Sequence, residues 1–126
     1  VTLLGQVEDM PALLAQTDIA VLPSYREGTP RSLLEAAACG LPLVATHAPG
    51  CREIVDHQVN GLLVPIKDAD ALAAAIHYLC HEREARQRMG QASRARALAA
   101  FDERLVFEEM LAVYQELMEG SVHQRR

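Results

Sequence analysis

Short apolar runs alternate along the chain with stretches in which apolar residues recur every three to four positions. Runs of the first kind have the length and composition of buried strands, and stretches of the second kind are typical of amphipathic helices. Strands separated by helices in this way indicate βαβ units. The sequence therefore predicts an α/β fold with a parallel sheet, whose strands we expect at residues 1–5, 18–22, 41–46 and 62–64.

Residues that begin or end helices mark the segments between the strands. A side chain that accepts hydrogen bonds at the N-cap, or a glycine that takes the left-handed conformation after the last turn, sets each boundary. The first expected helix is 10–16, after Asp9, and the second runs from Pro30 or Arg31 to Cys39 and is ended by Gly40. A third follows Asp68, with Leu72, Ala75, Ile76 and Leu79 on one face. A charged segment, 82–100, is expected on the surface with an interruption at Gly90, and a last helix follows Asp102. A short helical turn is expected at 51–55 and a tight turn at Asn60 and Gly61.

Composition narrows the class of partner. The net charge of -5 gives no broad cationic surface, so nucleic acid is not expected as a partner. The three cysteines form no CxxC pair, which favours neither a disulfide framework nor a zinc site, and the sequence shows no metal cluster. A reducing cytoplasm fits best. No apolar run reaches the ~20 residues of a spanning helix, so any contact with the inner membrane would be peripheral, through another part of the protein.

The loop between the second strand and the following helix carries the candidate chemistry. In open α/β sheets ligands bind at the carboxyl ends of the strands, where a helix begins with free backbone N–H groups and a partial positive charge. An anion is the expected ligand. The donors are the N–H groups of Arg31, Ser32 and Leu33, since Pro30 has none and Gly28 lets the backbone approach closely.

Two glutamates flank this anion site, Glu27 before the helix and Glu35 about one turn inside it. Ionised carboxylates only accept hydrogen bonds, and sugar hydroxyls are the parts of a nucleotide sugar that such groups suit. Glu27 therefore fits a transferred sugar and Glu35 a ribose. The alternative is that both are solvated charges, which is the commoner fate of glutamate.

Seven landmarks follow one another along nearly the whole chain. They are GQV at 5–7, MPALL at 10–14, DIAVLPS at 18–24, the pair Glu27 and Glu35 separated by seven residues, AAACGLPLVAT at 36–46, PGCREIV at 49–55 and NGLLVP at 60–65. In these landmarks, their order and their spacing the chain resembles the family four glycosyltransferases, also called glycosyl transferases group 1.

The resemblance implies the Rossmann-like donor domain of a retaining, metal-independent enzyme with the GT-B fold, and no cofactor. It assigns the base to the backbone near Val7 and the ribose to Glu35, and it makes Glu27 the catalytic residue that orients the transferred sugar. Diphosphate and sugar would be held by Thr29, Arg31, Ser32 and Leu33, beside Gly28. Many family members have glycine where this chain has Pro30, so one donor N–H is lost here.

The resemblance also implies that 1–126 is a single, partial domain, the C-terminal part of a GT-B second domain without its first strands. We expect a UDP-sugar or GDP-sugar as donor, and a glycan or lipid-linked acceptor held by a missing N-terminal domain. The helix at 102–119 would pack on that domain. In isolation the chain would expose an edge beside 18–22 or form a dimer, and it would not transfer sugar.

Several other functions remain open from the sequence. A nucleotide-sugar epimerase of the same fold and a non-catalytic nucleotide-sugar-binding module are the main alternatives. Two carboxylates also define glycosidases, although a glycosidase needs no anion site. A dehydrogenase is disfavoured because no GxGxxG is present. His47, in the loop after the third strand, is either a donor contact or a surface histidine.

Overall fold

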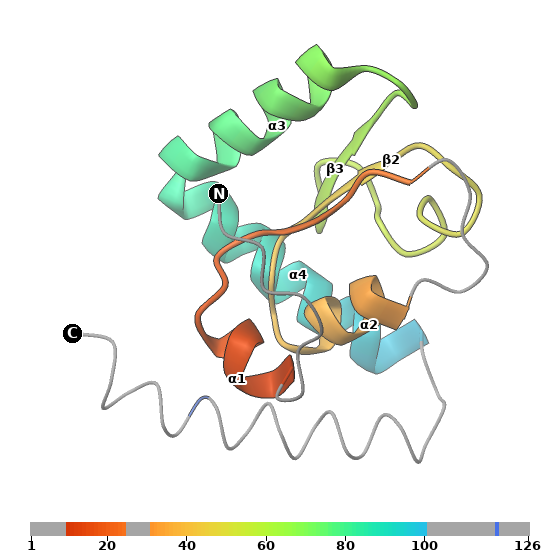
Figure 1. The fold of residues 1–126 in the computed structure, drawn as a ribbon. Helices are drawn as coiled ribbons and strands as arrows, with labels where there is room; N and C mark the ends of the chain where they lie inside the picture. Colours follow the sequence, from red (N-terminus) through yellow and green to blue (C-terminus); the bar gives the residue numbers. More distant parts are fainter. Residues whose placement is uncertain (1–9, 25–30, 101–117, 119–126) are drawn as a thin grey trace.

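The computed structural model describes residues 10–24, 31–100 and 118, and within this part the chain alternates between helices and parallel strands (Figure 1). The expected strand at 1–5, the helix caps Asp9 and Asp102, and the helix at 102–119 except Met118 lie outside the described residues. The elements are α1 (Met10–Ala15), β1 (Ala20–Leu22), α2 (Arg31–Ala38), β2 (Leu43–Thr46), β3 (Gly61–Val64), α3 (Ala69–His81) and α4 (Arg83–Ala100).

The described strands form one parallel sheet in the order β1-β2-β3. Ala20 is opposite Leu43 in the first pair, and Leu43 is opposite Gly61 in the second. Parallel neighbours require a crossover that returns the chain to the starting edge, and α2 supplies it between β1 and β2. The predicted class, a parallel sheet flanked by helices, is confirmed.

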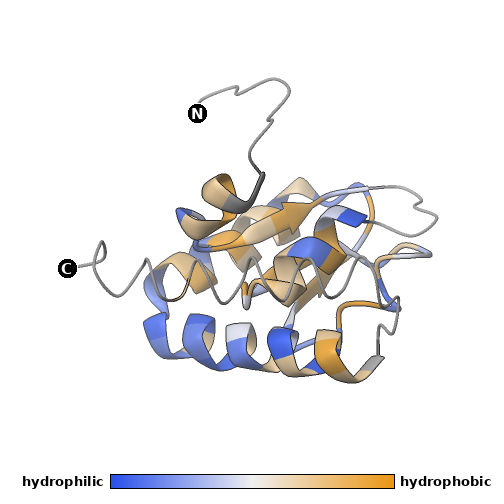
Figure 2. Ribbon diagram, turned by 90° about the horizontal axis from the view of Figure 1, so that it is seen from below, coloured by the Kyte–Doolittle hydropathy of each residue, from blue (hydrophilic) through white to orange (hydrophobic). Residues whose placement is uncertain are grey.

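The central strand β2 is buried along its whole length and separates two apolar clusters. Leu43 and Ala45 point into a cluster with α2, the 51–55 segment and Ala97 near the end of α4, and Val44 points into a cluster with α3 and Met89. Figure 1 shows α2 and α3 on opposite sides of the sheet, and in Figure 2 the apolar strands lie inside while hydrophilic residues gather on the helices. The alternation of side chains along β2 thus gives each face its own core.

Local capping residues define the helix ends as the sequence predicts. The Asp68 side chain accepts a hydrogen bond from the N–H of Ala71 at 2.9 Å and caps α3. Gly40 follows α2 with φ 76°, the left-handed conformation that ends a helix, and the N–H of Leu41 reaches back to the carbonyl of Ala36. Ala75 and Leu79 are buried on the predicted inner face of α3.

The charged segment 82–100 was expected on the surface and interrupted at Gly90. Glu82, Arg83 and Arg88 are exposed, as expected for a surface segment, but the expected interruption is wrong. α4 continues through Gly90, and Met89, Ser93 and Ala97 on one side of it are buried. A Cβ atom at position 90 would overlap the carbonyl oxygen of Gly40. The glycine therefore allows α4 to approach the end of α2 closely, and it does not break the helix.

The charges of α4 are partly structural. Arg86 donates to the carbonyls of Leu79 and Cys80 at 2.6 and 2.9 Å, and Arg94 donates to the carbonyl of Ala38 at 2.8 Å. The last carbonyls of a helix lack intrahelical partners, and cations are stabilising at that end. α4 therefore supplies side-chain caps to the carboxyl ends of both α2 and α3.

The turn before β3 lies earlier than expected. Asn60 and Gly61 were predicted to form it, but the backbone turns over 56–60, with Gln58 at φ 69°. Asn60 is buried, and its side chain bonds the N–H of Asp56 and the carbonyl of Ile54. Gly61 begins the strand, where a Cβ would overlap the Leu43 carbonyl. Close strand contact, rather than turn conformation, requires this glycine.

The first strand is shorter and less buried than predicted. The sequence favoured a fully buried strand at 18–22, whereas β1 spans Ala20–Leu22, and Val21 is 38% exposed. Within the described residues β1 pairs only with β2. The expected strand at 1–5 lies outside the described residues, so the exposed edge beside 18–22 and the alternative of a dimer both remain predictions.

Candidate functional site

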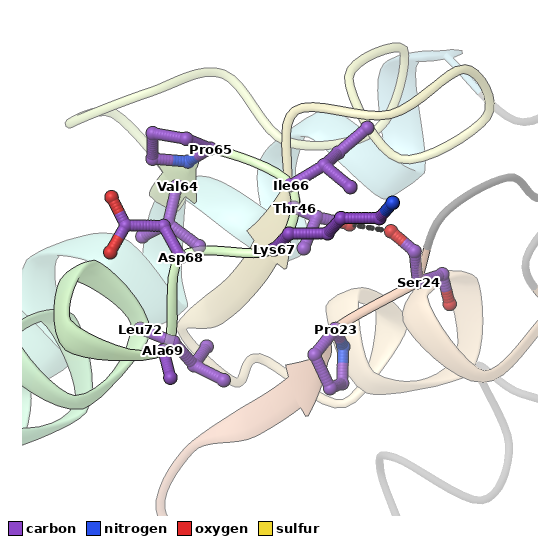
Figure 3. A pocket seen from close by; sticks show the side chains of 10 residues that line it. All are labelled: Pro23, Ser24, Thr46, Val64, Pro65, Ile66, Lys67, Asp68, Ala69 and Leu72. Atoms are coloured by element: carbon purple, nitrogen blue, oxygen red, sulfur yellow. Dashed lines mark hydrogen bonds between the residues drawn. The ribbon is translucent and has the colours of Figure 1, made fainter.

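The carboxyl ends of all three described strands meet at one edge of the sheet. Because the strands are parallel, the helices that follow β1 and β3 also begin there. A pocket of about 450 Å³ opens at this edge, shown in Figure 3. Its lining comes from the ends of β1, β2 and β3 and the start of α3, namely Pro23, Ser24, Thr46, Val64, Pro65, Ile66, Lys67, Asp68, Ala69 and Leu72.

Thr46 is a buried residue that lines this pocket at the end of β2. Its side chain is 5% exposed, and its hydroxyl donates to the carbonyl of Ser24, which fixes the end of β2 to the segment after β1. The backbone N–H of His47 continues the ladder by donating to the Val64 carbonyl at 2.7 Å. The His47 side chain is exposed directly after β2, and its contact with the donor stays a prediction.

The first turn of α2 carries three of the predicted ligand-binding residues. Arg31 and Ser32 are exposed, whereas the Leu33 side chain is 1% exposed and anchors the helix in the core. The early N–H groups of a helix have no carbonyl partner within it. The buried Leu33 side chain holds the first turn in place, so its backbone donors are positioned by the core.

Glu35 and Arg31 lie one helical turn apart and form an ion pair, with 3.0 Å between Nε and Oε1. The Arg31 side chain is 68% exposed and that of Glu35 is 21% exposed. One carboxylate oxygen is thus engaged by Arg31 at the accessible end of the helix. Two residues predicted to bind different parts of one ligand are therefore in contact with each other.

The remaining predicted site residues lie outside the described residues. These are Val7, Glu27, Gly28 and Thr29. Their roles stay predictions. Ser24 and Arg31, on either side of the segment 25–30, are both described, and both belong to the carboxyl edge of the sheet.

Lys67, in the loop between β3 and α3, lines the pocket and was not among the residues predicted for the site. It has φ 61°, which non-glycine residues rarely adopt. It is also the only lysine in the sequence, among eleven arginines. The single lysine was visible beforehand, but the loop conformation that places it at the strand ends was not.

Within the described ranges, no three His, Cys, Asp or Glu side chains gather in a way that could hold a metal ion. His77 and His81 contact each other on α3 with ring centroids 4.2 Å apart. In the same part of the chain, no helix has both the length and the apolar character that crossing a membrane requires.

Comparison with known sequences identifies related proteins. The family model described as "Glycosyl transferases group 1" matches residues 1–96. An N,N'-diacetylbacillosaminyl-diphospho-undecaprenol alpha-1,3-N-acetylgalactosaminyltransferase of Campylobacter jejuni is 34% identical over 93% of this chain and 31% of its own length. The chain thus spans about a third of the length of such relatives.

Solved structures share the fold of this chain. Sucrose-phosphate synthase of Thermosynechococcus elongatus superposes with a TM-score of 0.78 at 32% identity, over 95% of this chain and 31% of that one. Anabaena HepE, solved with UDP and with UDP-glucose, has a TM-score of 0.75 in the UDP complex at 29% identity, with the same coverage. The model match over most of the residues shows that the chain belongs to the glycosyl transferases group 1 family.

Proposed function

We propose that the chain forms the donor-binding part of a glycosyltransferase that uses a nucleotide sugar. The observation that carries the proposal is the position of the first turn of α2 and the 450 Å³ pocket at one edge of the parallel sheet. Group membership and the UDP and UDP-glucose complexes of HepE support a nucleoside diphosphate sugar as the ligand. UDP is the preferred nucleotide, with GDP as the alternative.

The proposed chemistry follows from the charge that develops in the reaction. Cleavage of the anomeric bond leaves a nucleoside diphosphate with growing negative charge, so donors fixed at that position stabilise the transition state. The N–H groups of Arg31, Ser32 and Leu33 and the Arg31 guanidinium supply such donors, and Thr29 and Gly28 would line the same anion. No metal or other cofactor is assigned a step.

The two glutamates have separate proposed roles. Glu35 accepts hydrogen bonds from the ribose hydroxyls, and Arg31 holds one of its oxygens and leaves the other available. Glu27 orients the transferred sugar, and the backbone near Val7 receives the base. We further propose that transfer retains the anomeric configuration and that the acceptor is a glycan or lipid-linked group, bound by a part of the enzyme outside this chain.

Amide chemical shifts of the ¹⁵N-labelled protein, titrated with UDP and GDP, test the anion site. We expect shifts concentrated at residues 27–35 and around the strand-end pocket. Uridine without phosphates should shift the first turn of α2 much less, because the anion is missing. Shifts confined to the opposite end of the sheet with every ligand would contradict the assignment.

Activity separates the proposed enzyme from the alternatives. Incubation with labelled UDP-glucose and mixed glycan acceptors should show no transfer by this chain alone, and transfer when the acceptor-binding part is present. A nucleotide-sugar epimerase would convert the donor without any acceptor. A binding module would bind UDP and do neither.

A further inference from the structure

The strand-end pocket contains a positive charge to which the proposed function assigns no role. Among its lining residues Lys67 is the only cation, and its neighbour Asp68 carries the only carboxylate. In Figure 3 the Lys67 side chain extends across the pocket toward Ser24, while the carboxylate of Asp68 points away from it. That carboxylate already accepts the Ala71 N–H as the cap of α3. The charge presented toward Ser24 is therefore positive.

The backbone at Lys67 is held in an unfavourable conformation. Its φ of 61° lies in the left-handed region, where a side chain costs energy that glycine avoids. Such residues persist where the surroundings impose them, and they concentrate at ligand sites. A glycine would suit the turn better, so the backbone conformation alone does not explain a lysine at this position.

The position of Lys67 matches a need of the proposed donor site. Pro30 lacks an N–H to offer an anion, and the positive charge of Arg31 is partly balanced by Glu35, which also occupies its Nε–H donor. The ammonium of Lys67 approaches Ser24, the last described residue before the segment that leads into α2. A diphosphate at the first turn of α2 would lie at the same edge of the sheet as this ammonium.

Resting on the proposed function, we infer that Lys67 is a further anion-binding residue of the donor site, whose ammonium pairs with the diphosphate of the nucleotide sugar. A lysine ammonium is a point charge with three donors, and it binds phosphate oxygens without the planar geometry that arginine needs. Lys67 thus offers positive charge to the diphosphate from the β3–α3 loop, and the N-terminus of α2 offers free N–H groups and a partial positive charge from the other side. It binds the leaving group and takes no part in proton transfer.

Three substitutions at Lys67 separate the effect of its charge on binding from the effect of its backbone conformation on stability. Lys67→Gly removes the charge and relieves the left-handed strain, so we expect a higher Tm together with UDP binding weakened about tenfold, the value of one charge-assisted hydrogen bond. Lys67→Arg keeps the charge and should retain most of the affinity. Lys67→Asn tolerates the conformation without the charge and should bind UDP as weakly as the glycine variant.

The single lysine also permits a direct chemical test on the unmodified protein. An amine-acylating reagent modifies Lys67 and the N-terminal amine, which peptide mass spectrometry separates. UDP should protect Lys67 and leave the N-terminal amine reactive, whereas uridine should protect neither. The protection and the tenfold effect should both decline as salt is raised, because an exposed ion pair is screened over about 8 Å at physiological ionic strength.

The outcomes distinguish this inference from the function on which it rests. Wild-type protein that binds neither UDP nor GDP would overturn both. Wild-type protein that binds UDP, while Lys67→Gly gains stability and binds equally well, would overturn the role of Lys67 alone. Loss of affinity in the glycine and asparagine variants, with affinity retained in the arginine variant and protection by UDP, would support it.

Discussion

At the amino end of α2, Arg31 is 68% exposed and pairs with Glu35 of the same helix. At the carboxyl end, Arg94 reaches in from α4 and binds the carbonyl of Ala38, beside the contact of Gly90 with Gly40. Both ends thus use an arginine, but one arginine is accessible to a ligand and the other closes a packed junction. The difference predicts that substitutions at the amino end alter binding and those at the carboxyl end alter stability.

The largest effect on stability is expected from Gly90→Ala. Alanine favours a helix over glycine by about 1 kcal/mol, so helix propensity alone predicts stabilisation. The added Cβ would instead overlap the Gly40 carbonyl, and we expect a loss of about 2 to 3 kcal/mol in the free energy of unfolding, as for overpacked cores. Urea denaturation measures it, with Gln91→Ala on the exposed side as the control. A stabilised Gly90→Ala protein would disprove the tight junction.

The next effect is on ligand binding, at the opposite end of the helix. Glu35→Gln should weaken UDP binding by about 1 to 3 kcal/mol through loss of a charge-assisted hydrogen bond. Its effect on stability should stay below about 0.5 kcal/mol, because the ion pair with Arg31 is exposed. Calorimetric titration and urea denaturation measure the two quantities. Equal losses of UDP affinity and of unfolding free energy would contradict the difference between the amino and carboxyl ends of α2.

Arg94→Met tests the closed end from the side of α4. Removing the guanidinium leaves the Ala38 carbonyl without this donor, and we expect a loss of about 1 kcal/mol in unfolding free energy with UDP affinity unchanged. Arg88→Met, at an exposed position of the same helix, is the matched control and should change stability by less than about 0.5 kcal/mol. An equal loss in both variants would argue against a specific cap.

The smallest effect concerns Cys39, directly after α2. Burial raises the pKa of its thiol from 9.0 to about 11, against the opposing influence of Arg94 and with a small contribution from the charge of Glu35. Between pH 9 and 11 the folded state therefore keeps the Cys39 proton, whereas the unfolded chain releases it. The stability that the protonated thiol contributes is fully present below pH 9 and is lost as the pH rises toward 11. The decline should be shallower in Cys39→Ala, as measured by Tm against pH. In alkylation at pH 8, exposed Cys80 should react well before Cys39.

Elements with a local cause were predictable from the sequence. The apolar run of β2, the Asp68 cap and the Gly40 terminator each depend on neighbouring residues, and all three are confirmed. The features that were not predicted depend on residues distant in the chain. From the sequence alone Gly90 suggests an interruption of the helix, whereas its contact with Gly40 explains the glycine. Asn60 likewise suggests a turn residue, whereas its side chain makes buried contacts, such as the hydrogen bond to the carbonyl of Ile54.

Some features of the candidate site were likewise predictable from the sequence, and others were not. The position of Arg31, Ser32, Leu33 and Glu35 at the start of a helix followed from the order of strand, loop and helix. The ion pair between Arg31 and Glu35 could have been anticipated from their spacing of four residues, which places both side chains on one helix face. The place of Lys67 in the pocket that Ser24 also lines could not, because the sequence gives neither the strand order β1-β2-β3 nor the left-handed conformation of Lys67.

The contacts of α4 have a consequence for the order in which the chain folds during synthesis. Arg86 and Arg94 complete the ends of α3 and α2, and the hydroxyl of Ser93 donates to the buried Asn60 carbonyl at 2.9 Å. All three residues leave the ribosome after the sheet and both helices have been made. A nascent chain that stops before α4 would therefore carry two helices with unfinished carboxyl ends, and β2 and β3 would lack their contacts with α4. We expect the described part to become protease-resistant only when α4 has emerged.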